Sequence, residues 1–172
     1  MYVWPPQATG LECRISPTCM KREAALVVPL FFIVLRSEEP EVLEKHNRPC
    51  LLVMRLKYAG KKRMFAVPFR SNIVGNAPKS QYFPLPPRPA TRTGNRHGLH
   101  YAKIIPVTKM FLERYRVDTS AALLYATIVS KNEKTIINEC QAYLEQYEQG
   151  ERPYYSTSLD KLIAKLECMD VK

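Results

Sequence analysis

Residues 50–69 read CLLVMRLKYAGKKRMFAVPF, and this stretch decides the fold. Two apolar runs, 50–58 and 63–69, flank the short segment 59–62, which contains a glycine and two lysines. Two such runs around a glycine-containing turn predict a β-hairpin. Because both runs are so rich in apolar residues, we expect the sheet that they begin to pack one face against the core.

On the N-terminal side, the apolar run 24–35 (AALVVPLFFIVL) predicts a buried strand over 27–35, and residues 38–45 predict a short acidic helix. The run superficially resembles the core of a signal peptide. It is too short to span a bilayer, contains Pro29, and is followed by no small-residue cleavage site. Residues 1–23, which show no apolar period, are expected to form a poorly structured N-terminal extension, with 24–172 as a single domain.

Proline-rich sequence follows the hairpin between residues 72 and 95, and no helix can run through it. We expect a long loop there, and loops of this length inside a compact domain usually serve binding. The loop leads into His100–Ile105, whose alternation predicts another strand. In a strand, His100 and Lys103 would face opposite sides.

The last third of the chain is predicted to be helical. Thr108–Arg116 predicts a short helix, and Ser120–Gln149 predicts a long one with a bend or break near Asn132. Thr157–Asp160 forms a capping box before a terminal helix. The apolar face of that helix consists of Leu159, Leu162, Ile163 and Leu166. Strands followed by helices predict the α+β class.

Positive charge is concentrated in the middle of the chain. The net charge is +10, and residues 45–116 hold sixteen Lys and Arg against one acid, Glu113, whereas each flank carries more acids than bases. A solvated face without a function usually mixes the two signs. The concentration therefore favours a polyanionic partner such as a nucleic acid.

Several classes of protein are poorly supported by the sequence. The five cysteines are scattered and include no C-x-x-C pair, so we expect neither a zinc site nor a disulfide framework, and a reducing cytoplasm fits best. The chain contains no P-loop, no glycine-rich dinucleotide turn and no H-E-x-x-H motif. We therefore expect no metal, no cofactor and no membrane partner.

Cutting RNA without a metal ion requires a base for the 2′-OH proton, an acid for the leaving 5′-oxygen, and cations or donors around the phosphate. His97 and His100 are candidates for proton transfer, and Lys103 follows them in the same segment. Two such histidines are more often structural than catalytic, and only the neighbouring cations favour catalysis. At the end of the hairpin, Arg70 and Ser71 are candidates to bind a phosphate, although a polar turn after a strand explains them equally well.

Further residues of the middle segment are candidates to bind RNA by charge, by hydrogen bonding or by stacking. They are Lys57, Lys61, Lys62, Arg63, Asn72, Lys79, Tyr82, Arg88, Arg92, Arg96 and Tyr101. Phe83, Tyr115, Tyr154 and Tyr155 are other aromatic residues suited to stacking on unpaired bases, and core packing explains most of these aromatics equally well.

Four segments together resemble a known family: NRPCLLV (47–53), FAVPFRSNI (65–73), QYFPLPPR (81–88) and GNRHGLHYAK (94–103). Their order and spacing are similar to those of the ToxN, AbiQ and CptN toxins of type III toxin-antitoxin systems, and closest to the CptN-like branch. The resemblance covers about residues 46–167.

This resemblance implies a compact, twisted antiparallel β-sheet flanked by helices, similar to the MazF and Kid toxins. It implies an endoribonuclease that leaves a 2′,3′-cyclic phosphate and is inhibited by a repeated pseudoknot RNA antitoxin within a closed toxin–RNA hetero-oligomer. It places the active site at Arg70 and Ser71. Many members carry Thr-Ser-x-Lys at this point, whereas this chain has Arg70 to Ile73 without the lysine. The general base is therefore open among His97, His100 and Lys103.

The sequence thus predicts a metal-independent endoribonuclease toxin. Arg70 and Lys103 would bind phosphate, Ser71 would donate a hydrogen bond, and His97 or His100 would transfer a proton. The main alternative is a non-catalytic RNA-binding protein that uses the same basic face. A third possibility is a protein-interaction module that presents the proline-rich loop.

Overall fold

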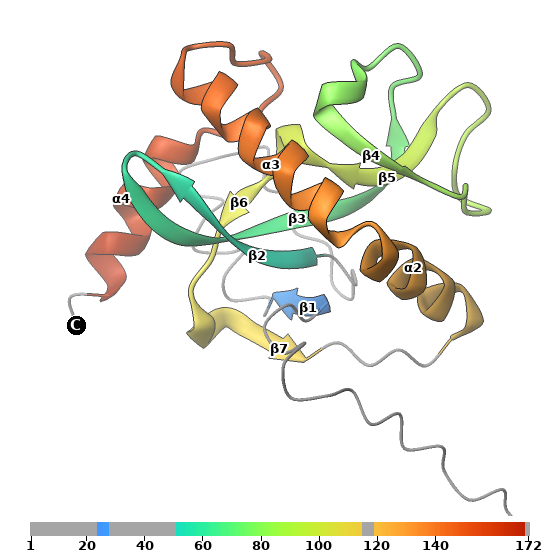
Figure 1. Ribbon diagram of the computed structural model, residues 1–172, viewed down its shortest axis with the longest axis horizontal. Helices are drawn as coiled ribbons and strands as arrows, with labels where there is room; N and C mark the ends of the chain where they lie inside the picture. Colours follow the sequence, from blue (N-terminus) through green and yellow to red (C-terminus); the bar gives the residue numbers. More distant parts are fainter. Residues whose placement is uncertain (1–23, 28–50, 115–118, 171–172) are drawn as a thin grey trace, which may run out of the picture.

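The computed structural model describes residues 24–27, 51–114 and 119–170, and the predicted β-hairpin lies at its centre (Figure 1). Strand β2 spans Leu51–Tyr58 and β3 spans Lys61–Ile73, with Tyr58 opposite Lys61. Only Ala59 and Gly60 form the turn, and both have positive φ, 48° and 73°. Such a turn matches the twist of the flanking strands. The hairpin is confirmed, and β3 continues four residues beyond its predicted end.

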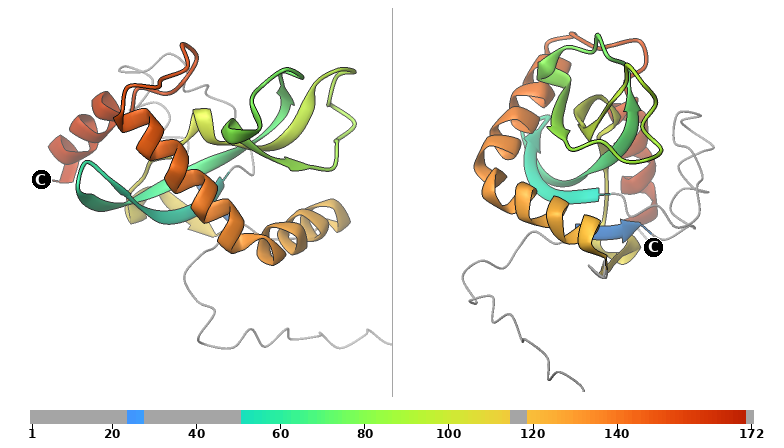
Figure 2. Two further views of the ribbon diagram at one scale, coloured as in Figure 1. Left: turned by 45° about the horizontal axis from the view of Figure 1, so that its top comes forward. Right: turned by 90° about the vertical axis from the view of Figure 1, so that its right-hand side faces the viewer.

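The described strands form one seven-stranded antiparallel sheet in the order β4-β5-β3-β2-β1-β7, with β6 also paired to β3. The outer strands β1 and β7 span Ala24–Val27 and Leu112–Arg114. The sheet is curled, as the right-hand view of Figure 2 shows. The long strand β3 organises it, because β2 pairs along one side and β5 and β6 share the other.

The region after β3 contains more regular structure than the sequence predicts. The expected loop over 72–95 includes the 3-10 turn η2 (Lys79–Gln81) and strand β4 (Tyr82–Leu85). Pro84 within β4 argues against a strand, but β4 is an edge strand, where the missing N–H faces no neighbour. The expectation of a loop throughout residues 72–95 is therefore wrong over β4.

The strand expected over 100–105 is also wrong. Strand β5 spans Arg96–His100, the 3-10 turn η3 spans Tyr101–Lys103, and β6 spans Ile105–Pro106. Leu99 pairs with Phe69, and Ile105 pairs with Ala66. Five residues lie between Leu99 and Ile105, which is more than lie between their partners Phe69 and Ala66 on β3. The chain therefore turns between β5 and β6.

The helices follow the predicted periodicity except for one. Helices α2 (Ser120–Lys131) and α3 (Glu133–Glu148) meet at Asn132, which confirms the break, and α4 spans Leu159–Asp170. The helix expected over 108–116 is wrong: a 3-10 turn, η4 (Lys109–Phe111), precedes β7, because pairing with β1 outweighs local helix propensity. Most of the strand expected over 27–35, the helix expected over 38–45 and the extension 1–23 lie outside the described residues.

The hydrophobic core lies between the sheet and the helices. Helix α3 packs on β2, and α4 packs near β6 (Figures 1 and 2). The apolar faces of the helices are buried: Tyr125, Val129, Ile136, Cys140, Tyr143, Leu144 and Tyr147 in α2 and α3, and, as predicted, Leu159, Leu162, Ile163 and Leu166 in α4. An antiparallel sheet flanked by helices confirms the α+β class.

Candidate active site

The sequence-predicted phosphate site falls on an irregularity of β3. The pairing with β5 shifts between Arg70, which is opposite Gly98, and Ile73, which is opposite Arg96. Ser71 and Asn72 therefore stand together opposite the single residue His97. Such a bulge bends the strand and redirects its side chains, and bulges are frequent beside active sites. The site is thus inside a distorted strand, not in a loop after it.

Asn72 has a structural role in this bulge. Its Oδ1 accepts a hydrogen bond from the backbone N–H of Arg92 at 2.9 Å, and its Nδ2 donates to the carbonyl oxygen of Ala90 at 3.3 Å. The loop that follows β4 is thereby tied back to β3. Asn72 was predicted to bind RNA, but in the structure its side chain makes these hydrogen bonds within the protein.

Arg70, His100 and Lys103 gather on one side of the sheet. His100 lies two residues from Gly98, the partner of Arg70, so Arg70 and His100 share a face. His100 is only 7% exposed, and neither of its ring nitrogens has a hydrogen-bond partner among the described residues. Burial, together with the positive charges of Arg70 and Lys103, lowers the pKa of His100 to about 4. His100 is therefore a neutral imidazole near two cations at pH 7.

Tyr155, from the connection between α3 and α4, completes this group. The ring centroids of Tyr155 and His100 are 6.2 Å apart, and the Lys103 Nζ atom lies 6.0 Å from the Tyr155 centroid. Lys103 Nζ also donates a hydrogen bond to the Tyr155 carbonyl oxygen, and the Tyr155 hydroxyl donates one to Oε1 of Gln81. We call Arg70, His100, Lys103 and Tyr155 the His100 cluster.

The expectation that His100 and Lys103 face opposite sides is wrong, because the turn η3 replaces the strand and brings both next to Tyr155. Sequence reasoning considered Tyr155 only as an aromatic that could stack on a base, and it missed Gln81. Tyr155 is 52 residues from Lys103 and 74 residues from Gln81 along the chain, and no local pattern links them.

His97 has a different environment from His100. Its ring is 2% exposed and packs edge-on against Tyr125 of α2, with centroids 5.0 Å apart. Its Nδ1 donates to the Pro86 carbonyl oxygen at 2.7 Å, and the Tyr125 hydroxyl donates to the same oxygen at 3.3 Å. Burial lowers the pKa of His97. His97 thus fastens the proline-rich loop to α2, and it stands apart from the His100 cluster because three residues along β5 reverse the face.

The residues predicted to bind RNA occupy several environments. Tyr82 and Tyr101 are buried, and the Tyr101 hydroxyl donates to Glu139 at 2.6 Å, so both rings belong to the core and not to a stacking surface. Arg88 lies over the Tyr125 ring at 4.9 Å, and Arg96 Nε donates to the Gly75 carbonyl oxygen at 3.1 Å. The exposed members are Lys57, Lys61, Lys62, Asn72, Lys79, Arg92 and Arg96.

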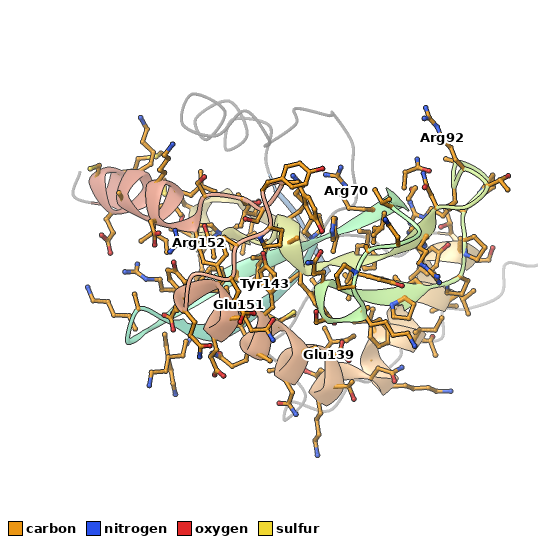
Figure 3. The ribbon with its side chains drawn as sticks, turned by 90° about the horizontal axis from the view of Figure 1, so that it is seen from above. Arg70, Arg92, Glu139, Tyr143, Glu151 and Arg152 are labelled. Atoms are coloured by element: carbon orange, nitrogen blue, oxygen red, sulfur yellow. The ribbon has the colours of Figure 1, made fainter. Side chains whose placement is uncertain are left out.

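The hairpin tip lies far from the His100 cluster. Arg70 lies nine positions after Lys61 in β3, and this step spans about 30 Å along a strand. Arg63 near this tip binds Glu167 of α4 at 2.7 Å. Arg92 lies at the end of a loop that extends away from Arg70 in Figure 3. The structure therefore does not gather all the predicted cations into one site.

Two further features of the described residues bear on the site. Within them, no group of three or more His, Cys, Asp or Glu side chains is placed to hold a metal ion. No helix in this part of the chain is long and apolar enough to cross a membrane.

Solved structures with a similar architecture are known. One matching chain comes from the structure described as "A processed non-coding RNA regulates a bacterial antiviral system", which contains a ToxN-type protein; it is 12% identical, covers 82% of this chain and 94% of its own length, and has a TM-score of 0.60. AbiQ, a lactococcal anti-phage endoribonuclease belonging to the type-III toxin-antitoxin system, is 15% identical, covers 86% and 97%, and has a TM-score of 0.62. The fold is that of AbiQ and ToxN. At these identities the likeness is one of fold, and the AbiQ fold includes the sheet that carries the His100 cluster. Neither a protein-family model nor a curated protein matches the sequence.

We expect His100 to make the fold less stable in acid. Its pKa is about 6.5 when unfolded and about 4 when folded, so between these values the unfolded chain binds a proton that the folded chain does not. The free energy of unfolding should therefore decrease as the pH is lowered below 6.5. Between pH 7 and pH 5 this group should account for a loss of about 2 kcal/mol. Urea unfolding at the two pH values measures the loss.

The matching variant is His100→Gln, which keeps a polar side chain but cannot titrate. Between pH 7 and pH 5 the free energy of unfolding of this variant should fall less than that of the wild type. Part of the fall that remains in the variant should come from His97, whose pKa is also lowered. An equal pH dependence in wild type and variant would show that His100 is not buried as described.

Proposed function

We propose that this chain is a metal-independent endoribonuclease toxin of a type III toxin-antitoxin system. The observation that carries the proposal is the His100 cluster, in which a neutral imidazole lies near two cations on the AbiQ fold. AbiQ is an anti-phage endoribonuclease of such a system, and the ToxN-type protein belongs to an antiviral system regulated by a processed RNA. The basic middle segment of the chain supports RNA as the partner.

In this proposal the His100 cluster, Ser71 and solvent together carry out a transesterification. Arg70 and Lys103 hold the scissile phosphate, and a ring nitrogen of His100 takes the proton of the adjacent 2′-OH. The O2′–P bond forms and the P–O5′ bond breaks, which leaves a 2′,3′-cyclic phosphate. The released 5′-oxygen takes a proton from solvent. Ser71 in the neighbouring bulge supplies a hydroxyl donor to the phosphate.

The bound phosphate also improves His100 as a base. Its negative charge offsets the positive charges of Arg70 and Lys103, which lower the pKa of the free imidazole. The pKa of His100 therefore rises when RNA binds, toward the range in which a general base works best near neutral pH. A cluster of cations also repels divalent metal ions, which fits a mechanism without metal. In this proposal His97 holds the proline-rich loop and does not transfer the proton.

The expected partners follow from the same proposal. The inhibitor is a repeated pseudoknot RNA that assembles with the toxin into a closed hetero-oligomer in the cytoplasm. The exposed Lys79, Arg92 and Arg96 lie on the segments that flank β4 and β5, and they supply charge for this RNA beyond the cleavage site. Lys57, Lys61 and Lys62 at the hairpin tip form a separate basic surface for it.

Incubating the purified chain with a defined RNA in EDTA tests the proposal. We expect cleavage that persists in the chelator, products that end in a 2′,3′-cyclic phosphate, and a rate at subsaturating RNA that falls steeply with added salt. Tight, salt-dependent binding without any product would instead identify a non-catalytic RNA-binding protein. Absence of both binding and cleavage by folded protein would overturn an RNA-directed function altogether.

A further inference from the structure

Tyr154 is the most exposed large hydrophobic side chain of the described residues, and it lies beside the His100 cluster. It is 99% exposed, whereas its neighbour Tyr155 is held in place. The Tyr154 and Tyr155 rings meet edge-to-face, with centroids 5.0 Å apart and an interplanar angle of 85°. A bare tyrosine ring beside a cationic cluster requires explanation, because aromatic rings gain free energy from burial.

The Tyr154 ring contacts Tyr155, a residue that is itself held in place. Tyr155 is anchored by its hydroxyl on Gln81, by its carbonyl oxygen on Lys103 and by its ring on His100. The centroid distances of 5.0 Å and 6.2 Å place the Tyr154 and His100 rings no more than about 11 Å apart. The exposed ring therefore lies beside an anchored residue, within reach of a nucleotide next to a phosphate bound in the His100 cluster.

An exposed aromatic ring beside phosphate-binding cations is the arrangement that binds single-stranded nucleic acid. The cations hold the backbone, and the ring stacks on a base that has no pairing partner. In an RNA duplex the bases are stacked on one another and are not available to such a ring. This arrangement therefore favours a single strand over a duplex and does not select a particular base.

We propose that Tyr154 stacks on an unpaired base adjacent to the cleaved phosphate. The inference rests on the proposed endoribonuclease function and adds to it a specificity-determining residue outside the His100 cluster. Tyr155 acts as a positioning residue that supports both Lys103 and the Tyr154 ring.

The experiment compares Tyr154→Ala, Tyr154→Phe and Leu123→Ala on one RNA and on copies with a single abasic nucleotide at each position next to the cut. Leu123 is 61% exposed on α2 and is the control for loss of an exposed apolar side chain. We expect Tyr154→Ala to lower kcat/KM about 10-fold on intact RNA, which matches the loss of one base–aromatic stack. Tyr154→Phe and Leu123→Ala should act like the wild type. All variants should melt at the wild-type temperature, because the replaced side chains are exposed.

The abasic substrates show whether Tyr154 acts on a base. At one position, removal of the base should lower the wild-type rate about 10-fold and leave Tyr154→Ala with no further loss. Binding to a strand with a 2′-deoxy nucleotide at the cut, which cannot be cleaved, should show the same pattern. A duplex containing the site should be cut more slowly than the single strand.

Two results would overturn the inference while the wild type cleaves: a Tyr154→Ala variant as active as the wild type, or a loss that is the same with and without each base. A duplex that is cut as fast as the single strand would contradict stacking of Tyr154 on an unpaired base. A wild-type protein that leaves the RNA intact would instead count against the proposed function itself, so the two failures are distinguishable.

Discussion

Replacement of His100 by glutamine should lower kcat for RNA cleavage about a thousandfold, since general base catalysis typically contributes on the order of 10²- to 10⁴-fold. Glutamine retains a polar side chain of similar reach but cannot accept a proton at neutral pH. Arg70 and Lys103 remain in the variant, so its affinity for RNA should stay close to that of the wild type. Single-turnover cleavage and RNA binding, measured on the same preparation, separate the two quantities.

The matched control is His97→Gln, three residues earlier on β5. His97 binds Pro86 and Tyr125 and does not contact the His100 cluster, so this change should loosen the proline-rich loop and cost stability. Its effect on kcat should stay below about tenfold. A large loss of kcat in His97→Gln with full activity in His100→Gln would reverse the assignment of the two histidines.

The pH profiles of the wild type provide a second check on His100. The profile of kcat/KM reports the free enzyme, and that of kcat reports the enzyme–RNA complex. Since a bound phosphate offsets the charges of Arg70 and Lys103, the acid limb of kcat should lie at a higher pH than the acid limb of kcat/KM. Coincident limbs would show that the phosphate does not bind beside His100.

Sequence reasoning was most reliable where structure is decided locally. The hairpin around Gly60, the break at Asn132 and the buried face of α4 all follow from patterns a few residues long. Strands β4 and β7 were missed because pairing partners far along the chain decide them. Pro84 is tolerated only because β4 lies at the sheet edge, and Leu112–Arg114 forms a strand only because β1 is beside it.

The candidate site could be predicted as a set of residues but not as an arrangement. The density of charge and the order of the motifs in the sequence indicate Arg70, His100 and Lys103. What the sequence could not supply is the 3-10 turn that brings Lys103 beside His100, and the anchoring of both by Tyr155. Nor could it separate His97 from His100, because the face of β5 that meets α2 depends on the packing of the whole sheet.

Gly98→Ala should be among the most destabilising single changes in the sheet. Gly98 lies in β5 between Arg70 of β3 and Pro84 of β4, and a Cβ at this position would lie 2.1 Å from the Phe83 carbonyl oxygen and 3.0 Å from its carbonyl carbon. Both atoms belong to the backbone of β4, so no side-chain rotation relieves the clash, and β4 must move away from β5. We expect a loss of about 3 kcal/mol, which corresponds to a fall in Tm of roughly 10 °C in calorimetry.

The control for Gly98→Ala is Gly60→Ala in the hairpin turn. A Cβ at Gly60 meets no atom within 4 Å, but its φ of +73° is unfavourable for alanine, so this change should cost only about 1 kcal/mol. Since Gly98 is also the partner of Arg70, the clash between β4 and β5 should also lower cleavage by the protein that remains folded, whereas Gly60→Ala should leave cleavage unchanged. Equal melting of the two variants would mean that β4 does not pack against Gly98.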